Sequence, residues 1–300
     1  MTIVPPAPDE PRRPDGPRDP GDAWVVTAEG AKYWGRFGAA GLLAVDAERG
    51  VLLQHRVAWS HHGDTWGLPG GARHEGESAC DGALRESAEE AGVPRAAVTP
   101  RLTSVYDVGV WSYSTVVADV TRPFQPVISD PESRELAWVP VDRVDDYLLH
   151  PGFAASWPRL RALLPVRPAI VVDAANVVGS VPNGWWRDRA GAAGRLRDEL
   201  EALAAKGVDA EVLGLPETVW FPEVHLVVEG EARAVDDAPE GAVRVVRADG
   251  AGDDTIVEVA ERLRADGRTV AAVTSDRGLT SRLEGVGASV RPVSWLRELL

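Results

Sequence analysis

The sequence predicts an α/β protein of two domains, and three observations support that prediction. The chain has 300 residues, which is too long for one average domain and about right for two. Its first half mixes apolar strand candidates with two helix candidates, whereas strands and helices alternate regularly after residue 168. Regular alternation favours a mostly parallel sheet, so the two halves should differ in architecture.

The first segment, residues 1–21, is rich in proline and charge and has almost nothing to bury. Such a composition predicts a disordered tail. Residues 22–165 are expected to form the first domain, a mixed α/β unit. Its strands are expected at 38–45, 50–55, 102–108, 111–119 and 135–139, and its helices at 78–91 and 155–164.

A short joint bounded by prolines, "PVRP" at 165–168, separates the two domains. The second domain is expected over residues 168–300, with a mostly parallel sheet of Rossmann-like type. Its strands are expected at 169–174, 224–228, 242–247, 269–275 and 288–292, and its helices at 187–205 and 254–265, in a short stretch before 288, and at 294–300.

Composition limits the class of protein. Cys80 is the single cysteine, so the chain cannot form an internal disulfide, which fits a reducing compartment. No apolar stretch approaches the roughly 20 residues that span a bilayer, and the first residues lack the apolar core of a signal peptide. A cytoplasmic location without a membrane partner is therefore expected. The formal net charge of -14 argues against broad binding to nucleic acid, although a local site that works through bound cations stays open.

Three glutamates lie together in the helix expected at 78–91. At about 100° per residue, Glu90 lies about 40° from Glu86 on one side and Glu89 about 60° on the other. Like charges at this spacing cost a helix roughly 0.2–0.5 kcal/mol per pair. A divalent cation would offset that repulsion, because carboxylate oxygens suit Mg²⁺ bound to a phosphate-bearing substrate. The alternative is an ordinary solvent-exposed acidic face.

The segment before this helix, "WGLPGG", predicts a tight turn. Pro69, Gly70 and Gly71 allow the backbone to approach a ligand or metal without side chains in the way. Gly92 stands where a C-terminal cap of the helix is expected. The stretch therefore has the order strand, tight loop, acidic helix and stop.

These residues resemble the Nudix box over its full spacing. The matching positions are Gly71, Glu77, Arg85, Glu86, Glu89, Glu90, Gly92 and Val93. The resemblance extends to about residue 164 and implies an α/β/α sandwich with a mixed sheet. One position departs from the pattern, since Ser87 stands where the family has an aliphatic residue.

The resemblance implies hydrolysis of a nucleoside diphosphate linked to another group, with Mg²⁺ or Mn²⁺ as cofactor. Carried over by position, Glu89 and Glu90 are metal ligands, Glu86 is a ligand or the base that activates water, and Gly71 contributes its carbonyl. Arg85 supports the site, as does Glu77. A further acid often joins from a distant segment, and Glu132 and Glu135 are both candidates. A fold that binds its ligand as a sensor, without turnover, is an alternative.

Substrate recognition has only weak signals in the sequence. Trp111 or Tyr113 could stack on a base, but aromatic side chains at such places are more often core or rim. The adjacent His61 and His62 do not form a convincing metal pair and are expected to be loop residues.

The second domain has its own acidic residues at the ends of expected strands. Asp173 ends the first strand, Asp253 and Asp254 open a helix and Asp276 ends a later strand, with Asn176 as a neutral polar neighbour. In parallel α/β sheets, sites form beyond the carboxyl ends of the strands, so these aspartates could converge. Each of them could instead act only as a helix N-cap.

The short motifs "DAANVVG", "DDTIVE" and "TSDRGL" are similar to those of the NYN group within the PIN-like nucleases. The resemblance covers roughly residues 169–300. It implies that Asp173, Asp254 and Asp276 hold Mg²⁺ and that Asp276 takes part in hydrolysis of an RNA phosphodiester. A domain that binds nucleotides without cleaving RNA is one alternative. Another is an RNA-processing enzyme whose first domain acts on capped RNA.

Overall fold

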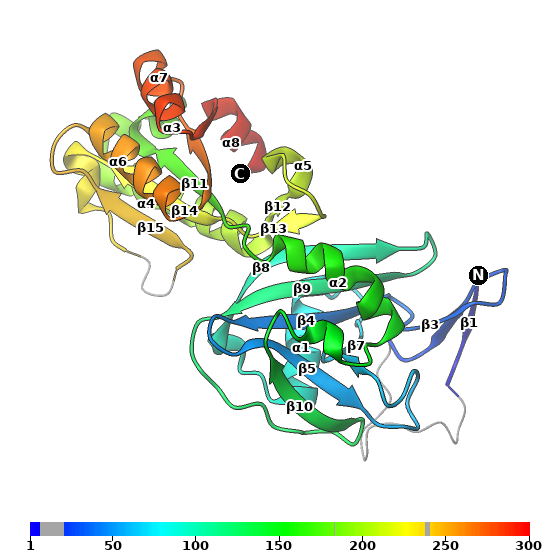
Figure 1. The fold of residues 1–300 in the computed structure, drawn as a ribbon. Coiled ribbons are helices and arrows are strands. Elements are labelled where there is room, and N and C mark those ends of the chain that lie inside the picture. Colours follow the sequence, from blue (N-terminus) through cyan, green and yellow to red (C-terminus); the bar gives the residue numbers. More distant parts are fainter. Residues whose placement is uncertain (7–20, 183, 238–240) are drawn as a thin grey trace. The chain divides into compact units, whose positions relative to one another are not determined.

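The computed structural model describes residues 1–6, 21–182, 184–237 and 241–300. The chain divides into two compact units, Met1–Leu164 and Pro165–Leu300, which Figure 1 shows in the colours of the sequence. In the described part of the chain, no helix is both long and apolar enough to cross a bilayer.

The first unit is built on a mixed sheet. Its strands lie in the order β10 (Ser133–Val139), β5 (Gly50–Arg56), β4 (Ala39–Asp46), β9 (Ser112–Val120) and β8 (Val98–Asp107). The β4–β9 pair is parallel and the other pairs are antiparallel. Two short strands, β6 (Trp66–Gly67) and β7 (Gly70–Ala72), pair with β5 and β4.

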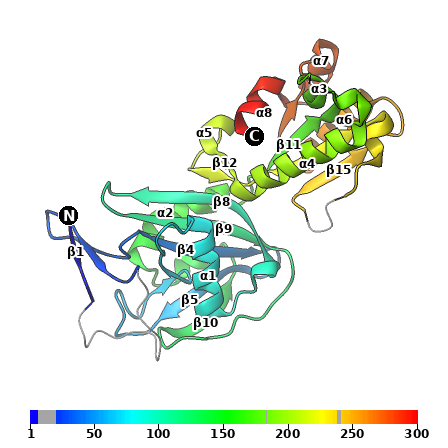
Figure 2. The ribbon, with the colours of Figure 1, turned by 180° about the vertical axis from the view of Figure 1, so that it is seen from behind.

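Helices cover both faces of this sheet. Figure 1 shows α2 (Pro151–Leu163) in front of the strands, and the view from behind in Figure 2 shows α1 (Ala79–Ala91) in front of them. Two single-turn helices, η1 (Arg95–Ala97) and η2 (Val144–Asp146), complete the unit. Leu42, Leu52 and Ala83 are buried between the sheet and α1. The predicted α/β/α arrangement is confirmed.

A small antiparallel sheet precedes these elements. It consists of β1 (Thr2–Val4), β2 (Trp24–Val26) and β3 (Lys32–Trp34). Residues 2–4 had been assigned to the unstructured tail, and here they pair with β2 because "TIV" is a short run of residues that favour strands. Residues 7–20 of that tail lie outside the described residues.

The second unit contains a five-stranded sheet in which every pair is parallel, as the alternating pattern predicts. The order is β15 (Val243–Arg247), β14 (Glu223–Val228), β11 (Pro168–Asp173), β16 (Thr269–Val273) and β17 (Ser289–Arg291). Five of its helices are α3 (Ala174–Gly179), α4 (Arg189–Lys206), α6 (Gly252–Ala265), α7 (Arg277–Gly285) and α8 (Val293–Leu299). Smaller pieces are η3 (Trp185–Arg187), β12 (Val208–Asp209), α5 (Ala210–Leu213), β13 (Val219–Trp220) and η4 (Gly230–Ala234).

Both faces of the parallel sheet are buried. In β11, Ile170 and Val172 pack with Leu196 and Leu200 of α4, whereas Val171 packs on the other face with Val259 of α6. This alternation follows from the period of two in a strand and explains why β11 reads as a continuous apolar run. Asp173 is therefore the point at which the chain leaves the core at the carboxyl edge of the sheet.

Candidate active site

The acidic helix α1 begins and ends where the sequence predicts. Ser78 is its N-cap, and the Ser78 hydroxyl accepts a hydrogen bond from the backbone N–H of Asp81 at 3.0 Å. Gly92 closes the helix in the left-handed region, with φ 63°, and the backbone N–H of Val93 then donates to Ser87 O at 3.2 Å. The two caps define where the helix begins and ends, and the three glutamates lie between them.

The three glutamates of α1 differ in burial. The side chains of Glu86 and Glu90 are buried, with residue exposures of 5% and 4%, whereas the Glu89 side chain is 40% exposed. Buried carboxylates require compensation, because an uncompensated charge is costly to remove from water. A solvated acidic face would leave all three exposed, so the burial does not support that alternative.

Arg85 connects the acids of this site to one another. Its Nε and Nη2 donate to the two carboxylate oxygens of Glu77, each at 2.9 Å. Its Nη1 donates to Glu86 Oε1 at 2.8 Å and to Glu89 Oε2 at 3.3 Å, and Nη2 also reaches Ala72 O at 3.0 Å. These hydrogen bonds hold the pKa of Glu77 below its usual range. Arg85 therefore positions the glutamates.

The Gly70–Gly71 turn packs directly on the carboxylates. The backbone N–H of Gly70 donates to Glu90 Oε2 at 2.9 Å. A Cβ at Gly71 would lie 2.8 Å from Oε2 of Glu86, closer than real Cβ contacts allow. At Gly70 the conflict would be with backbone, 2.4 Å from both Ala40 O and Gly41 Cα. Both positions therefore need glycine, because a side chain at either one would collide with its neighbours.

Glu90 is the most strongly perturbed acid of the first unit. Burial raises its pKa well above the usual value, and repulsion from Glu86, Asp130 and Glu132 adds to the effect. A cation bound among these carboxylates would relieve their repulsion. Of the two further acids considered, Glu132 is therefore close enough to act on Glu90, whereas Glu135 is exposed on β10.

A buried polar chain supports Glu90, and sequence analysis missed it. Gln54 is fully buried on β5, and its Nε2 donates to Ser133 Oγ at 2.7 Å and to Glu90 Oε2 at 3.4 Å. The Ser133 hydroxyl donates in turn to Asp130 Oδ1 at 3.0 Å. The available signal was Gln54 itself, a polar residue inside the apolar strand run "VLLQHR".

Ser87, the departure from the Nudix box, is accommodated inside α1. It is fully buried, and its hydroxyl donates to Leu84 O one turn earlier, at 3.1 Å. The hydroxyl is therefore satisfied within the helix. It makes no hydrogen bond to Glu86 or Glu90, so the departure leaves the acidic face intact.

The residues present fit a hard divalent cation. The donor set consists of buried carboxylates with a backbone turn that carries no side chain, and oxygen ligands of this kind are those Mg²⁺ and Mn²⁺ prefer. The space that a side chain at Gly71 would fill lies directly against Glu86. This geometry supports an ion held between the turn and the helix.

The aromatic candidates are engaged in packing. Trp111 stacks on Tyr33 with ring centroids 4.6 Å apart, and its Nε1 donates to Trp34 O at 3.0 Å. Tyr113 lies against Gly41, where a Cβ would stand 2.1 Å from its hydroxyl oxygen. Neither arrangement favours base stacking. His61 and His62 lie in the loop between β5 and β6, as expected.

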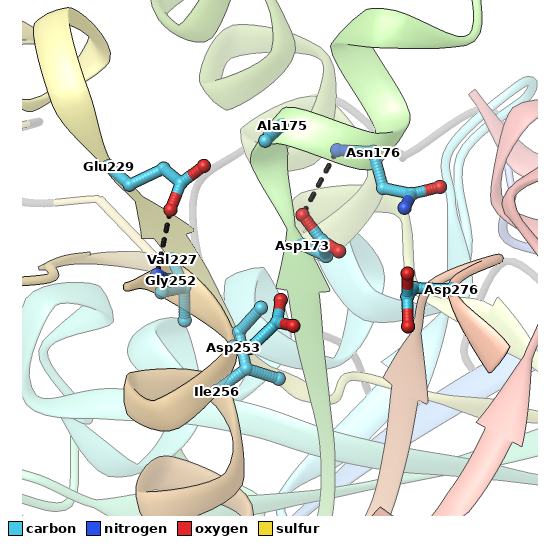
Figure 3. Close-up of a pocket in the computed structure, with 9 residues that line it drawn as sticks. All are labelled: Asp173, Ala175, Asn176, Val227, Glu229, Gly252, Asp253, Ile256 and Asp276. Atoms are coloured by element: carbon cyan, nitrogen blue, oxygen red, sulfur yellow. Dashed lines mark hydrogen bonds between the residues drawn. The ribbon is translucent and has the colours of Figure 1, made fainter. Parts of the chain in front are cut away.

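The second unit has an acidic pocket at the carboxyl edge of its sheet. Figure 3 shows its lining side chains, and the cavity measures about 300 Å³. Four carboxylates line it, from Asp173 at the end of β11, Glu229 after β14, Asp253 at the start of α6 and Asp276 after β16. Burial, followed by repulsion from Asp276, raises the pKa of Asp253, and burial raises that of Asp173. The convergence expected at this edge is present.

Asp254 does not belong to this pocket. Its carboxylate accepts a hydrogen bond from Arg282 Nη2 at 2.7 Å, on the outside of α6, and the neighbouring Asp253 lines the cavity instead. Consecutive residues on a helix point about 100° apart, so the choice between them depends on how α6 lies on the sheet. Sequence reasoning had named both aspartates and chosen Asp254 as the ligand. It missed Glu229, whose position directly after the apolar strand "VHLVV" was the available signal.

Two of the pocket aspartates are also helix caps. Asp173 Oδ1 accepts from the backbone N–H of Asn176 at 3.0 Å, and Asp276 Oδ1 accepts from that of Leu279 at 2.8 Å. Thr274 links them, because its hydroxyl donates to Asp173 Oδ2 at 3.0 Å and accepts from the backbone N–H of Asp276 at 3.2 Å. Capping and pocket lining therefore coexist, each cap using one oxygen.

Comparison with known proteins bears on the first unit. A family model described as "NUDIX domain" matches residues 35–163. A Mycobacterium tuberculosis protein named "Putative 8-oxo-dGTP diphosphatase 3" is 49% identical over 171 residues, covering 54% of this chain and 76% of that protein. A Bifidobacterium longum "Nucleoside triphosphate pyrophosphatase/Nudix hydrolase fusion protein" is 44% identical over 154 residues, covering 48% of this chain and 32% of that protein.

Among solved structures, a Nudix hydrolase from M. smegmatis, RenU, is 48% identical, with a TM-score of 0.45, and the match covers 48% of this chain and 94% of that one. The family match spans the turn, the acidic helix and the sheet that positions them. Since the M. tuberculosis relative is also matched at 49% identity over 76% of its length, this chain belongs to the Nudix family of pyrophosphate hydrolases.

Proposed function

We propose that the first unit hydrolyses a pyrophosphate bond in a nucleoside diphosphate derivative and that it requires Mg²⁺ or Mn²⁺. The observation that supports this most directly is the burial of Glu86 and Glu90 against a turn without side chains. Nothing in the stability of the fold needs two buried carboxylates beside each other, whereas a cation and a diphosphate do.

Glu89, Glu90 and the carbonyl of Gly71 would hold the ion, with Glu86 as a further ligand or as the base, and we add Glu132 ahead of Glu135. Glu132 contributes to the repulsion that raises the pKa of Glu90, which supports a position near this carboxylate, and its Oε2 lies 3.9 Å from Arg56 Nη2. A divalent cation at such a site neutralises charge on the diphosphate and lowers the pKa of a bound water.

Glu86 is our candidate for the base that takes the proton of the attacking water. Arg85 Nη1 donates to Oε1 of Glu86 at 2.8 Å, and both oxygens of this carboxylate lie against the Gly71 turn, 2.8 and 3.0 Å from where a Cβ there would stand. A base must lie within hydrogen-bond reach of the proton it accepts, and this position puts the carboxylate beside the proposed cation. Arg85 and Glu77 serve this reaction by positioning the acid.

The relatives indicate which substrate class to test first. Because the M. tuberculosis relative is named as an 8-oxo-dGTP diphosphatase, an oxidised purine nucleoside triphosphate is the first substrate to test. The phosphate-binding turn and helix would serve any nucleoside diphosphate derivative, whereas the base would be selected elsewhere in the unit. Dinucleotides, nucleotide sugars and capped RNA therefore belong in the same panel.

The test is a product analysis by mass spectrometry with Mg²⁺ present. The wild-type chain should convert a panel member to a nucleotide and a phosphate-bearing product, and Glu86→Gln should lower the rate by at least about a hundredfold, the scale of a lost general base. Glu75→Gln, which changes an exposed acid in the loop before α1, is the matched control and should keep full activity. Tight binding of a nucleotide without any product would favour a sensor instead.

A second candidate function rests on the acidic pocket of the other unit. Four carboxylates around a cavity at the carboxyl edge of a parallel sheet favour a second cation site, and we propose Asp173, Asp253, Asp276 and Glu229 for it. With the resemblance to NYN nucleases, RNA is the candidate substrate and Asp276 the residue to test. Mg²⁺-dependent cleavage of short RNA that disappears in Asp276→Asn would support this; no cleavage by the wild type would leave the unit as a binding domain.

A further inference from the structure

Three histidines of the first unit lie together on segments other than α1. They are His61 and His62, from the loop between β5 and β6, and His150, from the residue before α2. Each offers a ligand atom, and these atoms all lie within 4.8 Å of one another. His61 and His62 are adjacent in the sequence, whereas His150 is distant in the sequence and reaches them only through the fold.

We propose that His61, His62 and His150 form a site for one divalent cation of Zn²⁺ type. Imidazole nitrogen is a preferred ligand of Zn²⁺, and three protein ligands with a water in the fourth position form a known class of zinc site. With Zn–N distances of about 2.0–2.1 Å, tetrahedral ligand atoms stand about 3.3 Å apart. Small side-chain rotations would bring the three nitrogens from their present spacing to that one.

The backbone around His62 is built in a way that favours this arrangement. His62 has φ 54°, in the left-handed region that residues with a side chain rarely adopt. The Thr65 hydroxyl donates to His62 O at 2.6 Å and holds the strained residue in place. The consequence is that the two adjacent imidazoles lie beside each other, with ring centroids 4.1 Å apart, instead of pointing to opposite sides.

The ring of His150 is also held by specific contacts. It is the N-cap of α2, and its ring lies 4.8 Å from that of His62 at an interplanar angle of 89°. Its Nδ1 accepts a hydrogen bond from the backbone N–H of Gly152 at 3.2 Å, which is long for such a bond. A metal at either ring nitrogen would replace that one weak bond.

The charged side chain Arg56 borders the three rings, because its Nε donates a hydrogen bond to His61 O at 3.2 Å. Arg56 also repels a cation, but its Nη2 lies 3.9 Å from Glu132 Oε2, which offsets part of that charge.

The proposed site differs from the glutamate site in ligand chemistry. Glu86 and Glu90 offer hard oxygen ligands to Mg²⁺, whereas the three histidines offer nitrogen ligands to a borderline ion. Its effect would be structural, because the ion would tie the loop between β5 and β6 to the start of α2. A ring cluster that packs without binding any ion is the alternative, and the edge-on contacts of His61 with Trp24 and of His62 with His150 are what that alternative predicts.

The experiment uses the full chain, Co²⁺ as a spectroscopic probe and Zn²⁺ as competitor, in excess Mg²⁺ so that oxygen sites are filled. Tetrahedral nitrogen ligation gives Co²⁺ a strong visible absorption, which octahedral oxygen ligation does not. We expect one equivalent of Co²⁺ with strong absorption, displaced by Zn²⁺. Zn²⁺ should also raise the melting temperature, because it binds only the folded state.

The variants are chosen to keep the backbone as it is. Asn is a good N-cap and also tolerates the left-handed region, so His150→Asn and His62→Asn should both fold. Each should weaken binding by at least about a hundredfold, more than loss of an outer partner of a metal ligand costs. His61→Ala is the further variant if either fails to fold.

The matched control is His55→Asn, which removes an imidazole of the same unit that stacks on Trp66 and leaves the three ligands intact. It should bind Co²⁺ as the wild type does. Equal affinity in the wild type and His150→Asn, or weak absorption alone, would overturn the proposal and identify the three rings as packing.

Discussion

Glu90 and Glu86 are both buried, and the titration of the Glu90 carboxyl can be measured through its effect on stability. Burial and repulsion raise its pKa, so the native protein holds a proton that the unfolded chain has lost once the pH exceeds about 4.5. A native state that binds more protons loses stability as the pH rises, until the raised pKa is passed. Glu77, with its lowered pKa, acts in the opposite direction at more acidic pH.

The first prediction is therefore that, in the presence of a chelator, the free energy of unfolding falls as the pH rises above about 4.5. Glu90→Gln should flatten this dependence, because a neutral amide replaces the titrating group. Added Mg²⁺ should also reduce the slope, since it favours the ionised carboxylate. Denaturant unfolding across the pH range measures all three, and an unchanged slope in Glu90→Gln would contradict the assignment.

The two glycines of the turn should respond differently to the same substitution. In Gly71→Ala the added Cβ meets the carboxylate of Glu86, which can rotate away, so the fold should survive. Turnover should fall on the order of a hundredfold, the scale of a displacement of about 1 Å in a catalytic group. In Gly70→Ala the Cβ meets backbone atoms of Ala40 and Gly41 that cannot move, at a cost of about 1–3 kcal/mol.

Thermal unfolding and the rate of nucleotide hydrolysis separate these two effects. Gly71→Ala should lose activity at nearly the wild-type melting temperature, whereas Gly70→Ala should melt earlier. If Gly71→Ala kept full activity, the carboxylate of Glu86 would not need its present position, and its role as base would have to be withdrawn.

Single residues also mark the limit of what the sequence could predict. Glu86 and Glu90 could be placed on one helix face from their spacing alone, because α1 has clear caps and an uninterrupted helical period between them. The choice between Asp253 and Asp254 could not, since it depends on the packing of α6 against the parallel sheet. His150 likewise joins His61 and His62 only through the path of the chain between β10 and α2.

Among the elements, α1 matches its predicted range to within one residue, because Ser78 is a strong start signal for a helix and Gly92 a strong stop signal. The helix expected at 155–164 begins earlier, at Pro151, where proline occupies the first turn and His150 caps it. The short strand β6 lies where the order strand, tight loop and acidic helix predicts one, whereas the helix α3 was missed. Its 6 residues are too few for periodicity to show.

The end of α1 supplies a prediction at this scale. Gly92 has φ 63°, and a Cβ there would also lie 3.2 Å from Val127 Cβ. Gly92→Ala should therefore lower the free energy of unfolding by about 1–2 kcal/mol, and Gly92→Asn should lower it less, because Asn tolerates the left-handed region. Chemical denaturation of the three proteins tests this, and an equal loss in both variants would show that the contact with Val127 dominates.

For the molecule as a whole, the sequence predicted two kinds of sheet because two periodicities are present. Short paired strands with two helices gave the mixed sheet, and regular alternation gave the parallel one. The order β15–β14–β11–β16–β17 could not be predicted. The alternation of strands and helices along the chain predicts that neighbouring strands are parallel, but it does not predict which strands lie next to each other in the sheet. That order brings Asp173, Asp253 and Asp276 to one cavity.

The last prediction concerns the independence of the two units. Residues 1–164 contain the turn, the acidic helix and the complete core of the first unit, so this fragment should fold and hydrolyse the same nucleotide as the full chain. Its rate should match that of the full chain to within about twofold, as for sites without shared partners. Asp276→Asn in the full chain should likewise leave nucleotide hydrolysis unchanged, while Glu86→Gln removes it. A fragment that folds yet hydrolyses slowly would show that the second unit acts on the first, and the acidic pocket would then be the place to look for a regulatory ligand.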